Sequence, residues 1–140
     1  MLVHATTIDV AGLGVLITGE SGAGKSDLAL RLIARGALLV ADDQTDVSID
    51  GAALRATAPM PIKGLLEARG VGIVTAPLKR ATRLRLVVSL LSEEPERMPK
   101  PRIWSLPATE SPRIPLVEIC AFAPSVAEKV CIALSAVPEA

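Results

Sequence analysis

Residues 14–26 read Gly-Val-Leu-Ile-Thr-Gly-Glu-Ser-Gly-Ala-Gly-Lys-Ser, an apolar run that leads directly into a glycine-rich loop. The second part matches the pattern Gly-x-x-x-x-Gly-Lys-Ser at every fixed position. Glycines let the backbone turn tightly, so that several N–H groups converge on phosphate oxygens, and a following helix points its positive end at the same anion. The sequence therefore predicts a phosphate-binding loop made of Gly19, Glu20, Ser21, Gly22, Ala23, Gly24, Lys25 and Ser26.

The residues on both sides of this loop supply the context that the pattern requires. Residues 14–18 predict a short buried strand, and residues 26–35 predict a helix that places Leu28 and Leu32 on one stripe. Gly36 follows as a left-handed cap. In such loops the lysine, here Lys25, holds the β- and γ-phosphates of a nucleotide, and the serine hydroxyl, here Ser26, is a ligand for Mg²⁺. The motif indicates nucleotide phosphates, although it does not name the reaction.

Two adjacent aspartates come next along the chain. Residues 37–41 are fully apolar and predict a strand that ends at Asp42 and Asp43. A carboxylate at the end of such a strand is suited to hold Mg²⁺ bound at Ser26, and one aspartate is enough for that purpose. The second is then free to act as a general base. A turn at the end of the strand would bring both carboxylates to the site.

The rest of the chain predicts an α/β fold, with a mixed β-sheet flanked by helices in a single domain over residues 1–140. The pattern predicts strands at 2–10, 47–50, 53–57, 71–75, 84–91 and 114–120, and a second helix over 125–137. Residues 67–72 are polar and contain glycine, and no strand is predicted from them. We expect Ser125 and Glu128 to form a capping box at the start of that helix. Residues 93–115 are rich in proline and predict an ordered loop or an excursion at the sheet edge.

The composition and the distribution of apolar residues argue against a nucleic-acid-coating, secreted or membrane-spanning protein. Fifteen Lys and Arg balance fifteen Asp and Glu, and there is no Tyr and one Phe, which argues against a nucleic-acid-coating protein. The basic residues between Lys79 and Arg85 are interpreted as a solvated strand edge. Cys120 and Cys131 lie among apolar residues and are expected to be reduced. No segment has the pattern of a signal peptide or a membrane span, so we expect a cytoplasmic protein with no nucleic-acid or membrane partner.

With these features in place, the chain resembles the C-terminal catalytic domain of HPr kinase/phosphorylase. Four elements carry the resemblance, in family order: His4, the glycine loop, Leu-Val-Ala-Asp-Asp at 39–43, and Leu-Glu-Ala-Arg-Gly-Val-Gly-Ile-Val at 66–74. That family phosphorylates a serine of HPr, the phosphocarrier protein of the phosphotransferase system, and can reverse the reaction by phosphorolysis. The resemblance implies a P-loop kinase-like fold of the phosphoenolpyruvate-carboxykinase type.

The same resemblance implies roles for individual residues. Lys25 and the loop would hold ATP, while Ser26, Glu67 and Asp42 would hold Mg²⁺. Asp43 would take the proton from the substrate serine, His4 would contact the site from the neighbouring strand, and Arg97 looks like a later catalytic arginine of the family. The partner implied is an HPr-like phosphocarrier protein, and the family's hexamer implies a homo-oligomer.

Departures from the family pattern qualify these expectations. The chain starts directly at the catalytic domain and looks like the short form known from alphaproteobacteria. A late element of the family that is tied to dephosphorylation, Pro-x-Arg-Pro-Gly-Arg-Asn, is not recognisable, and residues 111–115 read Ser-Pro-Arg-Ile-Pro. The kinase direction is therefore favoured over phosphorolysis, and the hexamer becomes less certain.

Two other functions fit the same motif. A small-molecule kinase usually has an arginine-rich lid over the nucleotide, and Arg97, Arg102 and Arg113 are candidates for one. A nucleotide-sensing module would bind ATP without chemistry, although Asp42, Asp43 and Glu67 argue for catalysis. A phosphate-transfer assay with HPr-like proteins and small hydroxyl compounds separates the three.

Overall fold

The computed structural model describes residues 1–60, 64–107 and 109–138, and for Leu65 and Glu67 it describes the backbone alone. Two helices lie within these residues, α1 (Lys25–Ile33) and α2 (Val126–Ser135). The strands are β1 (Leu2–Val3), β2 (Thr6–Val10), β3 (Leu13–Thr18), β4 (Leu38–Ala41), β5 (Thr45–Asp50), β6 (Ala53–Thr57), β7 (Leu65–Ala68), β8 (Gly72–Thr75), β9 (Ala81–Leu91), β10 (Arg102–Trp104) and β11 (Ile114–Cys120).

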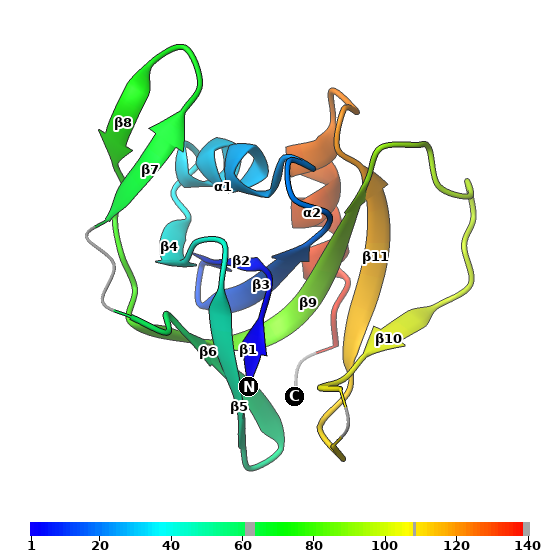
Figure 1. Cartoon of the computed structure of the whole chain (residues 1–140). Helices are drawn as coiled ribbons and strands as arrows, with labels where there is room; N and C mark the ends of the chain where they lie inside the picture. The colour runs from blue at the N-terminus through cyan, green and yellow to red at the C-terminus, as the bar shows by residue number, and fades with distance from the viewer. Residues whose placement is uncertain (61–63, 108, 139–140) are drawn as a thin grey trace.

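Most strands form one strongly curved mixed sheet, and this confirms the expected α/β class (Figure 1). Along it the order is β1-β5-β6-β9-β3-β2-β4. The long strand β9 pairs with β6 through its first residues and with β11 through its last, while β10 pairs with the outer edge of β11. Strands β7 and β8 form a separate hairpin that projects beside α1.

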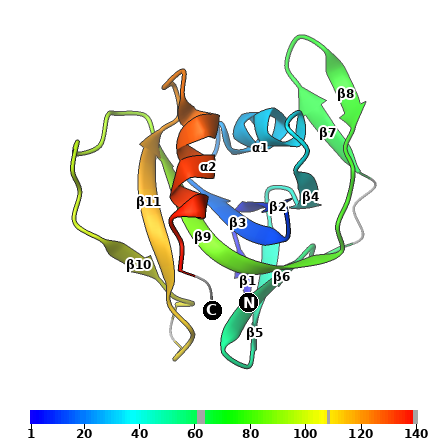
Figure 2. The ribbon, with the colours of Figure 1, turned by 180° about the vertical axis from the view of Figure 1, so that it is seen from behind.

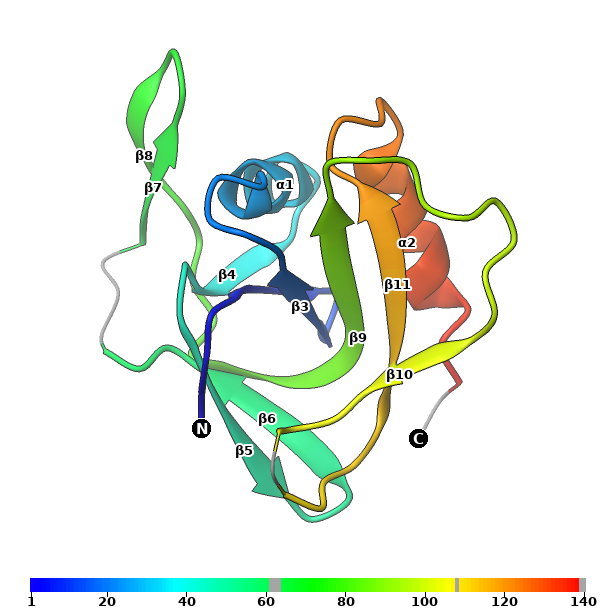
Figure 3. The same cartoon turned by 45° about the vertical axis from the view of Figure 1, so that its right-hand side comes forward.

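The middle of the sheet contains three parallel strands, β3, β9 and β11. Thr18 at the end of β3 pairs with Ser89, and Cys120 at the end of β11 pairs with Leu91. The carboxyl ends of these strands therefore meet at one edge of the sheet, where the chain leaves β3 for α1 (Figure 3). In open α/β sheets this is the edge where ligands bind.

Two apolar cores lie on opposite sides of β9. The first is covered by α1 and α2 and includes Leu86, Val88 and Leu90, while the second includes Leu84 and Val87 beneath β5, β6 and β10. The alternation of Leu84, Leu86, Val88 and Leu90 in the sequence predicts a strand buried on one face only. Both faces are buried because the curved sheet folds back on itself and covers the second face.

The helices lie side by side on the first core, and α2 crosses β11 and β9 (Figure 2). Leu28 and Leu32 of α1 are buried as predicted. The expected capping box is wrong, because Ser125 makes no side-chain hydrogen bond to the start of α2. The Glu128 carboxylate instead accepts a hydrogen bond of 2.6 Å from Arg35, which lies in the turn after α1. This bond joins α2 to that turn and lowers the pKa of Glu128.

Three further expectations need correction. The predicted strand over residues 2–10 is interrupted at His4 and Ala5, which separates β1 from β2. The polar segment 67–72, from which no strand was predicted, begins within strand β7, because the pairing with β8 extends on both sides of a tight turn. The basic residues between Lys79 and Arg85 do not lie on a sheet edge, since β9 is an interior strand. Cys120 is buried, Cys131 is partly buried, and both are free thiols as expected.

One buried carboxylate ties distant segments of the sheet together. Asp9 of β2 is 2% exposed and accepts hydrogen bonds from Lys79 Nζ at 2.9 Å, Thr82 Oγ1 at 2.6 Å and the Gly12 amide at 2.8 Å. Burial by itself raises the pKa of Asp9, but these hydrogen bonds and the Lys79 charge outweigh it and hold the pKa below its ordinary value. Asp9 therefore stabilises the fold in its ionised form.

Replacing this carboxylate should cost stability in a pH-dependent way. We expect Asp9→Asn to lower the free energy of unfolding by about 1–3 kcal/mol at pH 7, since hydrogen bonds to a charged group are lost. Because the folded pKa is depressed, the contribution is complete above the ordinary value of 3.8 and disappears as the pH falls through the folded pKa. Urea unfolding of both proteins at several pH values measures this. The exposed Asp50→Asn is the control, and a gap that stays constant with pH would contradict the assignment.

Candidate active site

The glycine loop turns the chain from β3 into α1. The Ala23 amide donates a hydrogen bond of 2.9 Å to the Glu20 carbonyl, which closes a turn at the loop's centre. Gly24 precedes the helix with a φ of +101°, a conformation that other residues rarely adopt. Helix α1 then starts at Lys25, and the amides of its first turn have no partner within the helix. The predicted order of strand, glycine loop and helix is thus present, and the unpaired amides at the start of α1 are suited to an anion.

Lys25 lies inside this loop and is 6% exposed. Its Nζ donates hydrogen bonds to the carbonyl oxygens of Gly19 at 2.9 Å and Glu20 at 3.0 Å. An ammonium group has three donors, so one is left for another acceptor. The side chain is therefore fixed with its positive charge at the loop, where an anion would be held.

Ser26 and Asp42 meet beside the loop. The Ser26 hydroxyl donates a hydrogen bond of 2.9 Å to Asp42 Oδ1, and the Thr6 hydroxyl donates one of 3.0 Å to the same oxygen. Three elements, α1, β2 and the end of β4, thus contribute oxygen atoms to one point. Such a group of hard oxygen donors is the kind that Mg²⁺ binds.

Asp43 turns out of the strand that precedes it. Its φ is +69°, and its amide donates a hydrogen bond of 3.2 Å to Thr6 Oγ1. The carboxylate is exposed, and its Oδ1 lies 3.9 Å from Nε2 of His4. The Thr6 hydroxyl thus contacts both the Asp42 carboxylate and the Asp43 amide, directly after β4 ends at Ala41.

Comparison of the sequence with models of protein families shows the family of this chain. The model of the HPr serine kinase C-terminal domain matches residues 1–102, which include the loop, both aspartates and the β7–β8 hairpin. The chain belongs to this family. The structure described above is therefore that of an HPr serine kinase C-terminal domain, and the resemblance inferred from its motifs is confirmed.

Individual members of the family agree with this assignment. The chain is 48% identical over 103 residues to an HPr kinase/phosphorylase of Clostridium novyi, covering 67% of the chain and 33% of that protein. It is 43% identical over 109 residues to one of Bordetella pertussis, covering 69% of the chain and 35% of that protein. The HPr serine kinase domain thus spans about a third of the length of these relatives.

The fold is similar to a solved structure over almost its whole length. The Hpr(Ser) kinase/phosphatase from Coxiella burnetii matches with a TM-score of 0.78 and 26% identity, covering 96% of this chain and 94% of that one. The likeness extends beyond residue 102, so β11 and α2 belong to the shared fold although the family model stops before them.

Two of the predicted site residues are not joined to the others by a described contact. Glu67 lies in β7, and its side chain is outside the described part of the structure. Arg97 is exposed between β9 and β10, and no hydrogen bond or ion pair joins it to another described residue. Their roles stay predictions.

The other lid candidates have different surroundings. Arg102 is paired with Glu118 at 2.5 Å across β10 and β11. Arg113 precedes β11 and so lies at the end of that strand opposite to the glycine loop, about 20 Å away at the usual rise per residue. No described hydrogen bond or ion pair joins either arginine to the glycine loop, so the small-molecule-kinase alternative gains no support from them.

Sequence reasoning missed Thr6. Its side chain is fully buried, and its hydroxyl bonds both to the Asp42 carboxylate and to the Asp43 amide. It therefore fixes the positions of the two aspartates. A usable signal was present, because a buried hydroxyl in a strand that pairs with β4 needs a polar partner.

No helix among the described residues has both the length and the apolar character needed to cross a membrane.

Proposed function

We propose that this domain is an ATP-dependent protein serine kinase that phosphorylates HPr, with the phosphoenolpyruvate-carboxykinase-like P-loop fold and the whole chain as one catalytic unit. The observation that carries the proposal is the Ser26–Asp42 hydrogen bond at the start of α1, the helix whose first residue is the buried Lys25. The Thr6 hydroxyl joins Asp42 to the backbone amide of Asp43. Family membership supports HPr as the substrate, since the relatives are named HPr kinase/phosphorylase.

Mg²⁺ fits the donor set around Ser26. The Ser26 hydroxyl and Asp42 Oδ1 are 2.9 Å apart and lie beside the loop that would hold the phosphates. No cluster of three His, Cys, Asp or Glu side chains occurs among the residues that could be searched, and Mg²⁺ bound to nucleotides usually needs only one or two carboxylates. When bound, the ion would neutralise charge on the phosphate oxygens. Glu67 is proposed as a further ligand on the strength of the family motif alone.

The reaction then follows from the positions of the charged groups. The Asp43 carboxylate takes the proton of the substrate serine hydroxyl as the serine oxygen bonds to the γ-phosphorus. The bond from that phosphorus to the β–γ bridging oxygen breaks, and ADP leaves. Lys25 and the loop amides stabilise the charge that develops on the phosphate oxygens. Exposure of Asp43 suits a base that must meet a serine on another protein.

His4 and Arg97 have supporting roles in the proposal. The imidazole of His4 lies next to Asp43 and would orient its carboxylate. Arg97 would approach the transferred phosphate from the segment between β9 and β10. In phosphorolysis the same groups would catalyse the reverse reaction, and Asp43 would return a proton to the serine oxygen. We propose the kinase direction as the main one. A homo-oligomer is proposed from the family alone.

A transfer assay with HPr tests the proposal. HPr from the same organism is incubated with the domain, γ-labelled ATP and Mg²⁺, and the product is mapped by mass spectrometry. We expect one phosphate on one serine of HPr and no transfer in the presence of a chelator. HPr with that serine replaced by alanine is the matched control.

Other outcomes of this assay would contradict the proposal. Label on a small hydroxyl compound and none on HPr would indicate a small-molecule kinase. Nucleotide binding without transfer to either acceptor would indicate a sensing module.

A further inference from the structure

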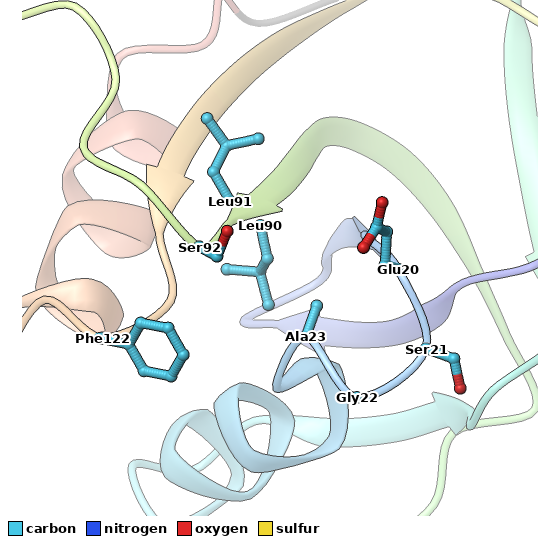
Figure 4. Close-up of a pocket in the computed structure, with 8 residues that line it drawn as sticks. All are labelled: Glu20, Ser21, Gly22, Ala23, Leu90, Leu91, Ser92 and Phe122. Atoms are coloured by element: carbon cyan, nitrogen blue, oxygen red, sulfur yellow. The ribbon is translucent and has the colours of Figure 1, made fainter.

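A cavity of about 290 Å³ adjoins the glycine loop (Figure 4). Its walls come from three segments: the loop itself, the end of β9 and the start of the connection from β11 to α2. The lining residues are Glu20, Ser21, Gly22, Ala23, Leu90, Leu91, Ser92 and Phe122. At the small end of the range for ligand pockets, this volume suits one part of a ligand.

Phe122 is the distinctive residue of this cavity. It is the only phenylalanine in a chain without tyrosine, and 76% of its surface is exposed to solvent. Figure 4 shows its ring facing the same space as the side chains of Ala23 and Leu90. The ring lies beside the apolar side chains of Ala23 and Leu90, so this wall of the cavity offers an aromatic face to a ligand.

The order of the strands places this cavity relative to the acidic groups. Strand β2 begins shortly after His4, and strand β4 ends just before Asp42 and Asp43. Both strands lie on one side of β3, whereas β9 and β11 lie on the other side. The glycine loop follows β3 and is therefore between the two groups. A polyphosphate held by this loop with its reacting end at the aspartates would extend its other end toward Phe122.

We propose that this cavity holds the base of the nucleotide, with the Phe122 ring stacked on it. Bases stack on aromatic side chains whatever their hydrogen-bonding edge, and the aliphatic side chains of Leu90 and Ala23 would cover the other part of the base. The inference rests on the proposed function, because it requires that the loop binds a nucleoside polyphosphate. It adds the place of the base and the residue that holds it.

The subsite is tested by the affinities of two ligands for the unchanged chain and for two variants of Phe122. Isothermal titration with ATP and with inorganic tripolyphosphate is carried out on the unchanged chain, on Phe122→Ala and on Phe122→Trp. Because loss of one base–aromatic stack weakens binding by about tenfold, we expect that loss for ATP with Phe122→Ala. Tripolyphosphate has no base, so its affinity should change by less than about twofold. Phe122→Trp keeps an aromatic face and should retain ATP binding.

The controls separate failure of this subsite from failure of the proposed function. Ile132→Ala removes a similarly exposed apolar side chain from α2, away from the cavity, and should change neither affinity. Equal ATP affinity in Phe122→Ala and in the unchanged chain would overturn the subsite while leaving the phosphate loop intact. If Phe122→Ala instead lost only affinity for HPr, the ring would contact the partner protein and the subsite would again be wrong. Failure of the unchanged chain to bind either ligand would refute the proposed function itself.

Discussion

Replacing Lys25 by alanine is expected to lower the rate of phosphate transfer to HPr by about 10²–10³-fold. The side chain is 6% exposed and holds its ammonium group against two carbonyl oxygens of the glycine loop. The variant removes the positive charge closest to where the γ-phosphate would lie, and no other lysine or arginine is described as bonded to this loop. Initial rates of HPr phosphorylation at saturating ATP, together with the Kd for ATP, measure the effect.

The matched control for this variant is Lys129→Ala. Lys129 is an exposed lysine of α2, and its loss should leave the rate unchanged. A thermal melt of Lys25→Ala shows whether the loop's lost hydrogen bonds affect folding. If folded Lys25→Ala protein transfers phosphate at more than a tenth of the original rate, the proposed role of Lys25 in stabilising the transferred phosphate is wrong.

Replacing Asp43 by asparagine is expected to lower the rate of phosphate transfer by about 10²–10⁴-fold. Asparagine has nearly the same shape as aspartate and tolerates the left-handed conformation in which Asp43 is held at a φ of +69°. The hydrogen bond from its backbone amide to Thr6 is also retained. The variant therefore removes the proton acceptor and leaves the turn in place. The measurement is the single-turnover rate of transfer to HPr.

Nucleotide affinity distinguishes a base from a group that only holds ligands. In Asp43→Asn the Kd for ATP with Mg²⁺ should stay within a few-fold of the original value, because Ser26 and Asp42 are untouched. Asp50→Asn, an exposed aspartate at the end of β5, is the control. A normal transfer rate in Asp43→Asn would show that another group takes the proton.

Local sequence patterns predicted the strand, glycine loop and helix order around residues 14–33, which the structure contains. The spacing of Gly19, Gly24 and Lys25 has physical meaning at each position, because the loop's shape depends on neighbours in sequence. The same is true of the strand that ends at Asp42. These features are short-range, so one chain contains enough information to place them.

Long-range packing accounts for what the sequence did not predict. The burial of both faces of β9 depends on the sheet curling back on itself, which no periodicity within residues 81–91 records. Thr6 was missed because its importance comes from Asp42, which is 36 residues away in sequence. Glu128 does not form the expected capping box, because it pairs instead with Arg35 in the turn that follows α1. In each case the deciding partner is distant along the chain.

The parallel pairing of β11 with β9 has a consequence for the integrity of the domain. The residues with proposed roles in phosphate chemistry all precede residue 102, yet Ile119, Val126, Val130 and Leu134 complete the core on which α1 rests. A fragment that kept every one of those chemical groups but ended there would leave the inner side of α1 in contact with water. Residues of β11 and α2 therefore stabilise the position of α1, although no role in phosphate transfer is proposed for them. A substitution that unfolds α2 is expected to displace α1 and the glycine loop, even though the loop itself is unchanged.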